Sequence, residues 1–172
     1  MCIRDSSKGI DLFDAYENPM PLTFGRLESG TWPASAPDYA ILEGVLGFLP
    51  NKTRDDISAE LKNILRKKHP SLTDDNWRLS FTYRHDSSVL SPSHPLPQGL
   101  MAAHRAMNLP AAIDAMPASC DAWFYNNLLN IPTVVYGPGS LKVAHSKMEQ
   151  IRLTEIADAA AALAAFAAAF CR

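Results

Sequence analysis

The sequence is poor in several residue types, and each scarcity argues against a class of protein. Among 172 residues there are only three cysteines, Cys2, Cys120 and Cys171, and their spacing fits neither a zinc knuckle nor a disulfide framework. The 16 basic and 18 acidic residues nearly balance, and no basic stripe occurs. A nucleic-acid partner is therefore not expected. We expect a reducing, cytoplasmic compartment.

No segment predicts export or a membrane span. Residues 1–7, MCIRDSS, contain charges and lack the apolar core of a signal peptide. The C-terminus is rich in alanine rather than leucine and carries Glu155 and Asp158. This composition favours a packed helix, so no membrane partner is expected.

The first half of the chain has an α+β pattern. With 47% hydrophobic residues, the sequence has enough apolar side chains for a core. Alternating residues predict strands within 20–30, 39–50 and 76–85, and the glycines of the second suggest a bulge or a close backbone approach. A helix is predicted within 51–70, with Thr53 capping its start.

The second half alternates helices and strands, which is typical of a parallel α/β sheet. A linker rich in serine and proline at 86–97 precedes it. The predicted elements are a helix at 98–108, a short strand at 111–119, a helix at 120–130, a buried strand at 131–137 and a helix from about 147 to 170.

His145 is the first candidate for chemistry. The predicted strand at 131–137 ends in Gly137, Pro138 and Gly139, and such a strand delivers its loop to the carboxyl end of the sheet, where ligands gather. Neutral imidazole is a common zinc ligand. From the residues alone, His145 is either such a ligand or an exposed loop histidine.

Glu149 has two interpretations. Together with His145 it forms H-x-x-x-E, which resembles part of a metal motif. Together with Ser146 it forms S-x-x-E, which predicts a capping box at the start of the last helix. We favour capping for Ser146 and Glu149.

Asp121 stands at the start of the predicted helix at 120–130. An aspartate there commonly caps the helix or complements its dipole, and a substrate-binding role is the alternative. Cys120 is expected to be a small buried residue rather than a nucleophile. His104, within a helix, is expected to be a satisfied surface or core residue.

These residues form a longer pattern that resembles a known family. SCDAWFYNNLLNIPTVVYGPGSLKVAHSKMEQI, residues 119–151, is similar to the family of acetylornithine deacetylase, succinyl-diaminopimelate desuccinylase, glutamate carboxypeptidase and aminoacylase. The shared features are an Asp that opens a helix, Ile-Pro-Thr, Gly-Pro-Gly, and Ala-His followed by a glutamate. Residues 21–57 also resemble the family's inserted lid, or dimerisation, domain.

The resemblance implies a dinuclear zinc hydrolase that cleaves the amide bond of N-acyl amino acids or small peptides. His145 would bind one of two metal ions, usually zinc, with cobalt or manganese as alternatives. Metal binding lowers the pKa of a shared water and polarises the substrate carbonyl. Gly137, Pro138, Gly139 and Asp121 would lie against the substrate, and the lid would form a homodimer.

The resemblance also implies that much of the enzyme is absent. The family's early His-x-Asp pair, its bridging aspartate and its Glu-Glu pair, which includes the general base, have no counterpart here. We therefore expect a partial ferredoxin-like lid over residues 8–90 and the C-terminal part of a zinc-peptidase α/β catalytic domain over 91–172. Residues 1–7 match nothing in the family and are interpreted as an unrelated prefix. Such a chain is expected to be inactive alone.

Two departures from the family leave the substrate open. Many relatives carry arginines where this chain has Trp123 and Val45, and such arginines can hold a substrate carboxylate. Arg26 and Arg84 are candidate substitutes. Two other classes remain as alternatives, a non-catalytic homodimerisation module of ferredoxin-like type and a small-molecule sensor.

Overall fold

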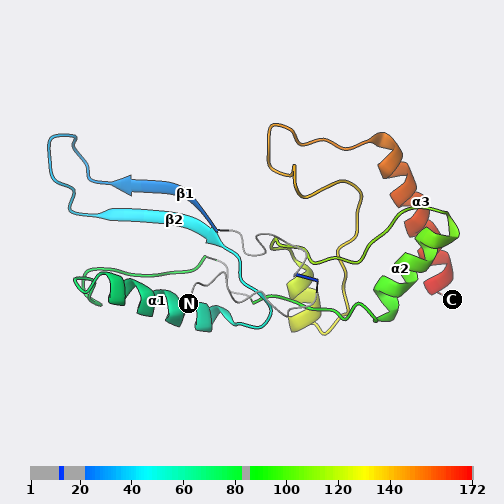
Figure 1. Ribbon diagram of the computed structural model, residues 1–172, viewed down its shortest axis with the longest axis horizontal. Coiled ribbons are helices and arrows are strands. Elements are labelled where there is room, and N and C mark those ends of the chain that lie inside the picture. Colours follow the sequence, from blue (N-terminus) through cyan, green and yellow to red (C-terminus); the bar gives the residue numbers. More distant parts are fainter. Residues whose placement is uncertain (1–11, 14–21, 83–85, 172) are drawn as a thin grey trace. The chain divides into compact units, whose positions relative to one another are not determined.

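The computed structural model describes residues 12–13, 22–82 and 86–171, so the predicted prefix at 1–7 and Arg84 lie outside the described residues. Its elements, in chain order, are strands β1 (Leu22–Ser29) and β2 (Ala40–Leu46), helices α1 (Arg54–Lys68) and α2 (Pro95–Ala106), the π-helical segment η2 (Phe124–Leu128) and helix α3 (Leu153–Phe170) (Figure 1). One compact unit combines the chain up to Ser87 with Ala115–Cys120, and the other combines Ser88–Asp114 with Asp121–Arg172.

The first unit contains the two strands that the sequence predicts within 20–30 and 39–50, and the structure pairs them as an antiparallel hairpin. Leu22 pairs with Leu46 at one end and Ser29 with Ala40 at the other. The register shifts between Phe24 and Arg26, which places a bulge at the glycine between them. At Gly44 a Cβ atom would lie 2.5 Å from the Thr23 carbonyl oxygen, so the close backbone approach expected in the second strand is confirmed.

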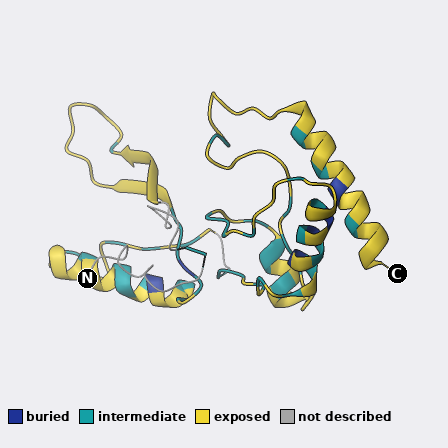
Figure 2. Ribbon diagram, turned by 45° about the vertical axis from the view of Figure 1, so that its right-hand side comes forward, coloured by how far each residue is buried: buried dark blue, intermediate teal, exposed yellow. Residues whose placement is uncertain are grey.

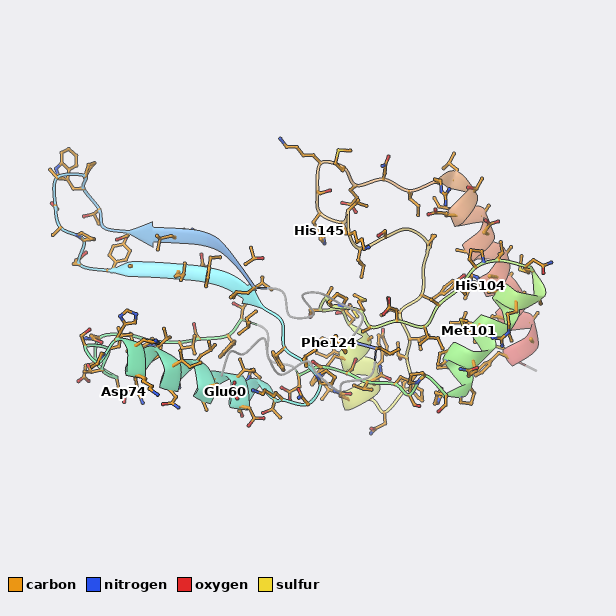
Figure 3. All side chains as sticks on the ribbon, in the orientation of Figure 1. Glu60, Asp74, Met101, His104, Phe124 and His145 are labelled. Atoms are coloured by element: carbon orange, nitrogen blue, oxygen red, sulfur yellow. The ribbon has the colours of Figure 1, made fainter. Side chains whose placement is uncertain are left out.

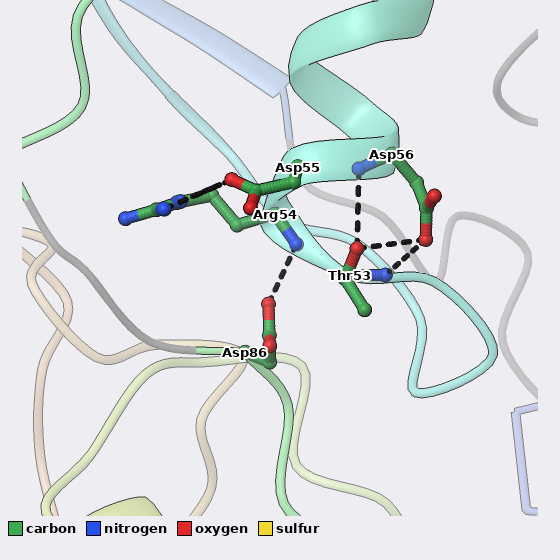
Figure 4. Close-up of polar contacts among 5 residues, drawn as sticks. All are labelled: Thr53, Arg54, Asp55, Asp56 and Asp86. Atoms are coloured by element: carbon green, nitrogen blue, oxygen red, sulfur yellow. Dashed lines mark hydrogen bonds and ion pairs between the residues drawn. The ribbon is translucent and has the colours of Figure 1, made fainter.

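Helix α1 begins with the cap that the sequence predicts (Figure 4). The Thr53 hydroxyl accepts from the Asp56 amide at 3.1 Å, and the Asp56 carboxylate accepts from the Thr53 amide at 2.9 Å. Asp86 adds a contact from outside the helix, because its Oδ1 accepts from the Arg54 amide at 2.6 Å. These bonds satisfy three N–H groups at the start of the helix. Ile57, one turn on, is 1% exposed and belongs to the unit's core.

The strand predicted over 76–85 is not present in the described residues 76–82. Burial still alternates every second residue, because Trp77, Leu79 and Phe81 are half-buried and the residues between them are exposed. Alternation selects a face, but a strand also needs a neighbour for its backbone hydrogen bonds. Among the described elements, β1 contacts only β2, and neither contacts α1. The structure therefore does not show a ferredoxin-like sandwich.

The second unit is organised around the α2–α3 pair (Figure 1). A Cβ atom at Gly99 on α2 would lie 2.7 Å from the Phe166 ring of α3, so only glycine allows this approach. Phe166 and Phe170 stack beside it with ring centroids 4.8 Å apart. Leu100 and Ala103 on α2 are buried, and Ala162 is the buried residue of α3.

Helix α3 is largely exposed, as the colouring of Figure 2 shows. Its 18 residues have a mean hydropathy of 1.6, long and apolar enough to cross a membrane by length and composition. One such helix is weak evidence for a span, because core helices of soluble proteins share these properties. It contacts α2, as expected of a packed helix, but Ala162 is the single buried residue among Leu153–Phe170.

Two further strand predictions in this half are wrong for the described residues. Neither 111–119 nor 131–137 contains a strand, and Ile131 and Val135 are exposed. The buried parallel strand expected at 131–137 needs strands on either side, and no described segment supplies them.

Candidate functional site

His145 lies on a long loop between η2 and α3, away from the α2 helix that carries His104 (Figure 3). The loop advances by a series of turns, with the Val143 amide donating to the Ser140 carbonyl and the Ser146 amide to the Val143 carbonyl. His145 itself has a φ of 59°, a left-handed conformation that costs energy for a residue other than glycine. Its ring is exposed.

Glu149 is the partner of His145. The His145 backbone amide donates to Glu149 Oε2 at 2.9 Å, which closes a ring around the histidine. Backbone strain at a loop residue persists only where neighbouring contacts enforce it. The carboxylate therefore fixes the backbone that presents the imidazole, while neither ring nitrogen takes part in this bond.

The capping role predicted for Ser146 and Glu149 is corrected by the position of α3. The helix begins at Leu153 rather than near Lys147, and its N-cap residue, Arg152, makes no capping side-chain bond. The Ser146 hydroxyl donates to the Val143 carbonyl and accepts from the Met148 amide. The Glu149 carboxylate reaches the His145 amide instead of the serine amide, so S-x-x-E here closes a turn.

The Gly-Pro-Gly loop, defined as Gly137, Pro138 and Gly139, is exposed along its length. A Cβ atom at Gly137 would meet nothing within 4 Å, whereas Gly139 has a φ of 90° and requires glycine. An open depression follows the loop. Its lining residues are Gly139, Ser140, Val143, Gln150, Ile151, Arg152 and Glu155.

Asp121 opens a short helical segment, as predicted, and its carbonyl accepts from the Phe124 amide at 3.0 Å. Its side chain is exposed. Within the described part of the chain, no hydrogen bond links Asp121 to His145. The structure thus brings Glu149 to His145 and leaves Asp121 on a separate element.

Two side-chain contacts hold the segment before the Gly-Pro-Gly loop, and one of them involves His104, which is satisfied as the sequence predicts. Asn126 exchanges two hydrogen bonds with the backbone of Thr133, and the Tyr136 hydroxyl lies 2.8 Å from Nε2 of His104. The partners are 7 and 32 residues apart in the chain, and the periodic patterns that predict helices and strands do not indicate these contacts.

The described residues alone do not fit a metal centre. No group of three His, Cys, Asp or Glu side chains converges anywhere in the described ranges. His145 offers one imidazole, and one ligand does not hold zinc against water. Any metal site that uses His145 therefore needs ligands beyond those the described residues bring together.

Comparison with known proteins identifies the class. Residues 12–169 match the family described as Peptidase family M20/M25/M40, and because this match spans most of the 172 residues, the chain belongs to that family. The result confirms, at the level of the family, the resemblance to metal-dependent hydrolases. Membership implies the use of a divalent metal, typically zinc.

Two curated relatives are similar to the chain. One is the N-formyl-4-amino-5-aminomethyl-2-methylpyrimidine deformylase of Bacillus subtilis (strain 168), 28% identical over 149 residues, which are 77% of this chain and 34% of the relative. The other is an uncharacterized metallohydrolase of Methanocaldococcus jannaschii, 27% identical over 104 residues, which are 58% of this chain and 29% of the relative. The chain therefore spans about a third of the length of these relatives.

Proposed function

We propose that this chain is the C-terminal part of a zinc-dependent hydrolase that cleaves the amide bond of an N-acyl amino acid or small peptide. His145 supplies one metal ligand, and the Gly-Pro-Gly loop and Asp121 lie against the substrate. The other ligands and the general base come from a part of the enzyme outside residues 1–172. The cytoplasm is the proposed compartment.

The observation that carries the proposal is the family match together with the backbone at His145. The match includes the whole loop from Gly137 to Glu149. Within it, a strained histidine is held by a carboxylate that leaves both ring nitrogens available. Strain of this kind concentrates at functional sites.

When bound in the complete enzyme, zinc would lower the pKa of a coordinated water and polarise the carbonyl of the scissile amide. The residues of this chain have simpler tasks. Glu149 holds the backbone of His145, and the exposed glycines of the loop let a substrate approach the main chain closely.

The acyl group is the open part of the proposal. The name of the Bacillus subtilis relative describes the removal of a formyl group, so a small acyl group on nitrogen is the chemistry to test first. The resemblance implies that Trp123 and Val45 stand where many relatives carry arginines. Arg26 on the lid-like hairpin is paired with Glu28 and Glu43. We therefore propose a substrate whose carboxylate, if present, is held by another group.

Metal content and hydrolysis test the proposal together. The 172-residue chain, incubated with zinc and dialysed, should retain no stoichiometric zinc and should not hydrolyse N-formyl, N-acetyl or N-succinyl amino acids above the buffer rate. Stoichiometric zinc with hydrolysis by this chain alone would contradict the assignment of the other ligands to a separate part.

In a longer product of the same reading frame, His145→Ala should lower zinc content and activity. Loss of a direct ligand should reduce activity at least about 100-fold, because even outer partners of metal ligands contribute about 10–100-fold. His69→Ala is the matched control, since His69 is an exposed residue at the end of α1. Equal activity of the two variants would remove His145 from the metal site.

A second candidate, a homodimerisation module, is favoured by the hairpin. All of β1 and six of the seven residues of β2 are exposed, including Phe24 and Leu27 at 65% and 71%. Exposed apolar strands are typical of surfaces that pair with another chain. Sedimentation equilibrium over a range of protein concentrations distinguishes a dimer from a monomer, and we propose that the lid-like half forms the dimer in either case.

A further inference from the structure

Tyr136, the residue before the Gly-Pro-Gly loop, is anchored to both helices of the α2–α3 pair. Its hydroxyl lies 2.8 Å from Nε2 of His104 on α2 and 3.2 Å from the carbonyl oxygen of Ala159 on α3. The two rings meet edge to face, with centroids 5.7 Å apart. Burial raises the pKa of Tyr136, so the hydroxyl keeps its proton. The start of the loop is thereby joined to the most regular part of this unit.

A second anchor holds the chain three residues earlier. Asn126 Nδ2 donates to the Thr133 carbonyl at 2.9 Å, and the Thr133 amide donates to Asn126 Oδ1 at the same distance. The side-chain amide of Asn126 thus bonds both the N–H and the C=O of Thr133, as a neighbouring strand would. Asn126 lies within η2, and π-helical turns are frequent at functional sites.

The ring of His104 decides how Tyr136 is held. The Tyr136 hydroxyl has a single hydrogen, which it donates to the Ala159 carbonyl oxygen, so it can bind Nε2 of His104 only by accepting from Nε2–H. Nδ1 lies 3.0 Å from the carbonyl oxygen of Pro110, which can only accept, so this contact is a hydrogen bond only when Nδ1 carries a hydrogen. In the neutral ring one nitrogen carries the hydrogen, and Tyr136 is bonded to both helices only in the Nε2–H form. The clamp on Tyr136 therefore has a spectroscopic signature.

We propose that Tyr136 is a positioning residue, held by His104 and assisted by Asn126, that fixes where the Gly-Pro-Gly loop begins and thereby where His145 is presented. The inference rests on the proposed function, because it assigns a task within that site. The loop needs such an anchor, since Gly137 has no neighbour for a Cβ within 4 Å and the residues of the loop are exposed. Binding groups work only when their supports are fixed.

The first test measures the tautomer of His104 in the unmodified 172-residue chain. Long-range ¹H–¹⁵N correlation spectra at about pH 8, where an ordinary imidazole is neutral, distinguish Nδ1–H from Nε2–H. The proposal requires Nε2–H at His104. An Nδ1–H tautomer overturns it, because the single hydrogen of the Tyr136 hydroxyl could not then bind both His104 and Ala159.

The second test compares Tyr136→Phe with Tyr125→Phe. Tyr125 is 46% exposed, so its variant removes a hydroxyl of the same type outside the clamp. Tyr136→Phe should shift the amide resonances of residues 137–145 and speed exchange of the His145 amide about fivefold, the equivalent of one ordinary hydrogen bond. Tyr125→Phe should leave both unchanged. Equal effects of the two variants overturn the proposal.

Two features keep these tests decisive. If Tyr136→Phe fails to fold, His104→Gln replaces it. Glutamine lacks the ring that spans Pro110 and Tyr136 but keeps a polar side chain on α2. Neither measurement depends on hydrolysis. A complete enzyme that binds no metal through His145 would end the proposed function, whereas an Nδ1–H tautomer of His104 would end the positioning role alone.

Discussion

At the scale of single residues, polar side chains bond backbone groups that lie outside any helix or strand. Glu149 closes the turn around His145, and Asn126 satisfies the backbone of Thr133. Each bond fixes a backbone that no strand or helix holds. Loss of such a bond leaves a backbone group without its partner, which makes these positions sensitive to substitution.

The first residue-scale prediction concerns the cap of α1. Thr53→Ala should lower the free energy of unfolding by about 1 kcal/mol, because the Asp56 amide loses its acceptor. Urea unfolding followed by circular dichroism measures the change. Thr31→Ala is the control, as Thr31 lies in an exposed loop. A Thr53 effect no larger than that of Thr31 would show that the cap is unimportant.

The second concerns pH. Hydrogen bonds from the Thr53 amide and hydroxyl hold the pKa of Asp56 below its ordinary value. A carboxyl whose pKa is lower in the folded state stabilises the fold above the unfolded pKa of about 3.9, and this contribution disappears as the pH falls through the folded pKa. Asp56→Asn should therefore flatten the loss of stability in acid. Identical acid profiles for the variant and the parent would contradict this.

At the scale of elements, two close approaches depend on glycine. Gly44 allows β2 to lie against the Thr23 carbonyl, and Gly99 allows α2 to meet the Phe166 ring. The obstacle at Gly44 is backbone, whereas at Gly99 it is an aromatic side chain. Two pairs of elements, β1 with β2 and α2 with α3, make the contacts between the described helices and strands.

The hairpin prediction is that Gly44→Ala disrupts the pairing of β1 and β2. The added methyl would lie 2.5 Å from a backbone oxygen, so the strands must separate locally. Amide hydrogen exchange within Ala40–Leu46 should accelerate. Gly25→Ala is the control, because a Cβ there meets nothing within 4 Å. Unchanged protection in Gly44→Ala would refute the register described for the hairpin.

The helix-pair prediction is that Gly99→Val destabilises the second unit by about 1–3 kcal/mol, the usual cost of overpacking. Phe166 is stacked on Phe170, so the ring cannot move freely out of the way. Thermal unfolding measures the effect, and Gly137→Ala, at an open position, should be nearly neutral for stability. A neutral Gly99→Val would mean that α2 and α3 do not pack in this way.

Local patterns in the sequence predicted the elements whose bonds are local. The cap at Thr53, helices α1 and α2, and strands β1 and β2 were each indicated by residues close together in the chain, whereas the pairing of the two strands was not predicted. The strands expected at 76–85 and 131–137 depend on neighbours that the pattern does not contain. The start of α3 was misplaced because S-x-x-E also suits the turn that holds His145.

The candidate site follows the same division. His145 was found through its place after the Gly-Pro-Gly loop, and its role as a metal ligand stays a prediction. The clamp formed by His104 and Tyr136 was missed, since 32 residues separate them in the chain.

At the scale of the whole molecule, the chain is a member of the M20/M25/M40 family that spans about a third of its curated relatives. Its described residues present His145 on an exposed loop and no converging set of three metal-binding side chains. A zinc ion bound by a protein needs several protein ligands. The central claim is therefore that His145 belongs to a metal centre that a further part of the enzyme completes.

Sequencing of the source DNA upstream of codon 8 tests this claim most directly. We predict an open reading frame that continues into residues 8–172 and encodes a His-x-Asp segment and a Glu-Glu pair. A start codon with no such frame before it would contradict the claim, because His145 would then have no partners with which to bind a metal.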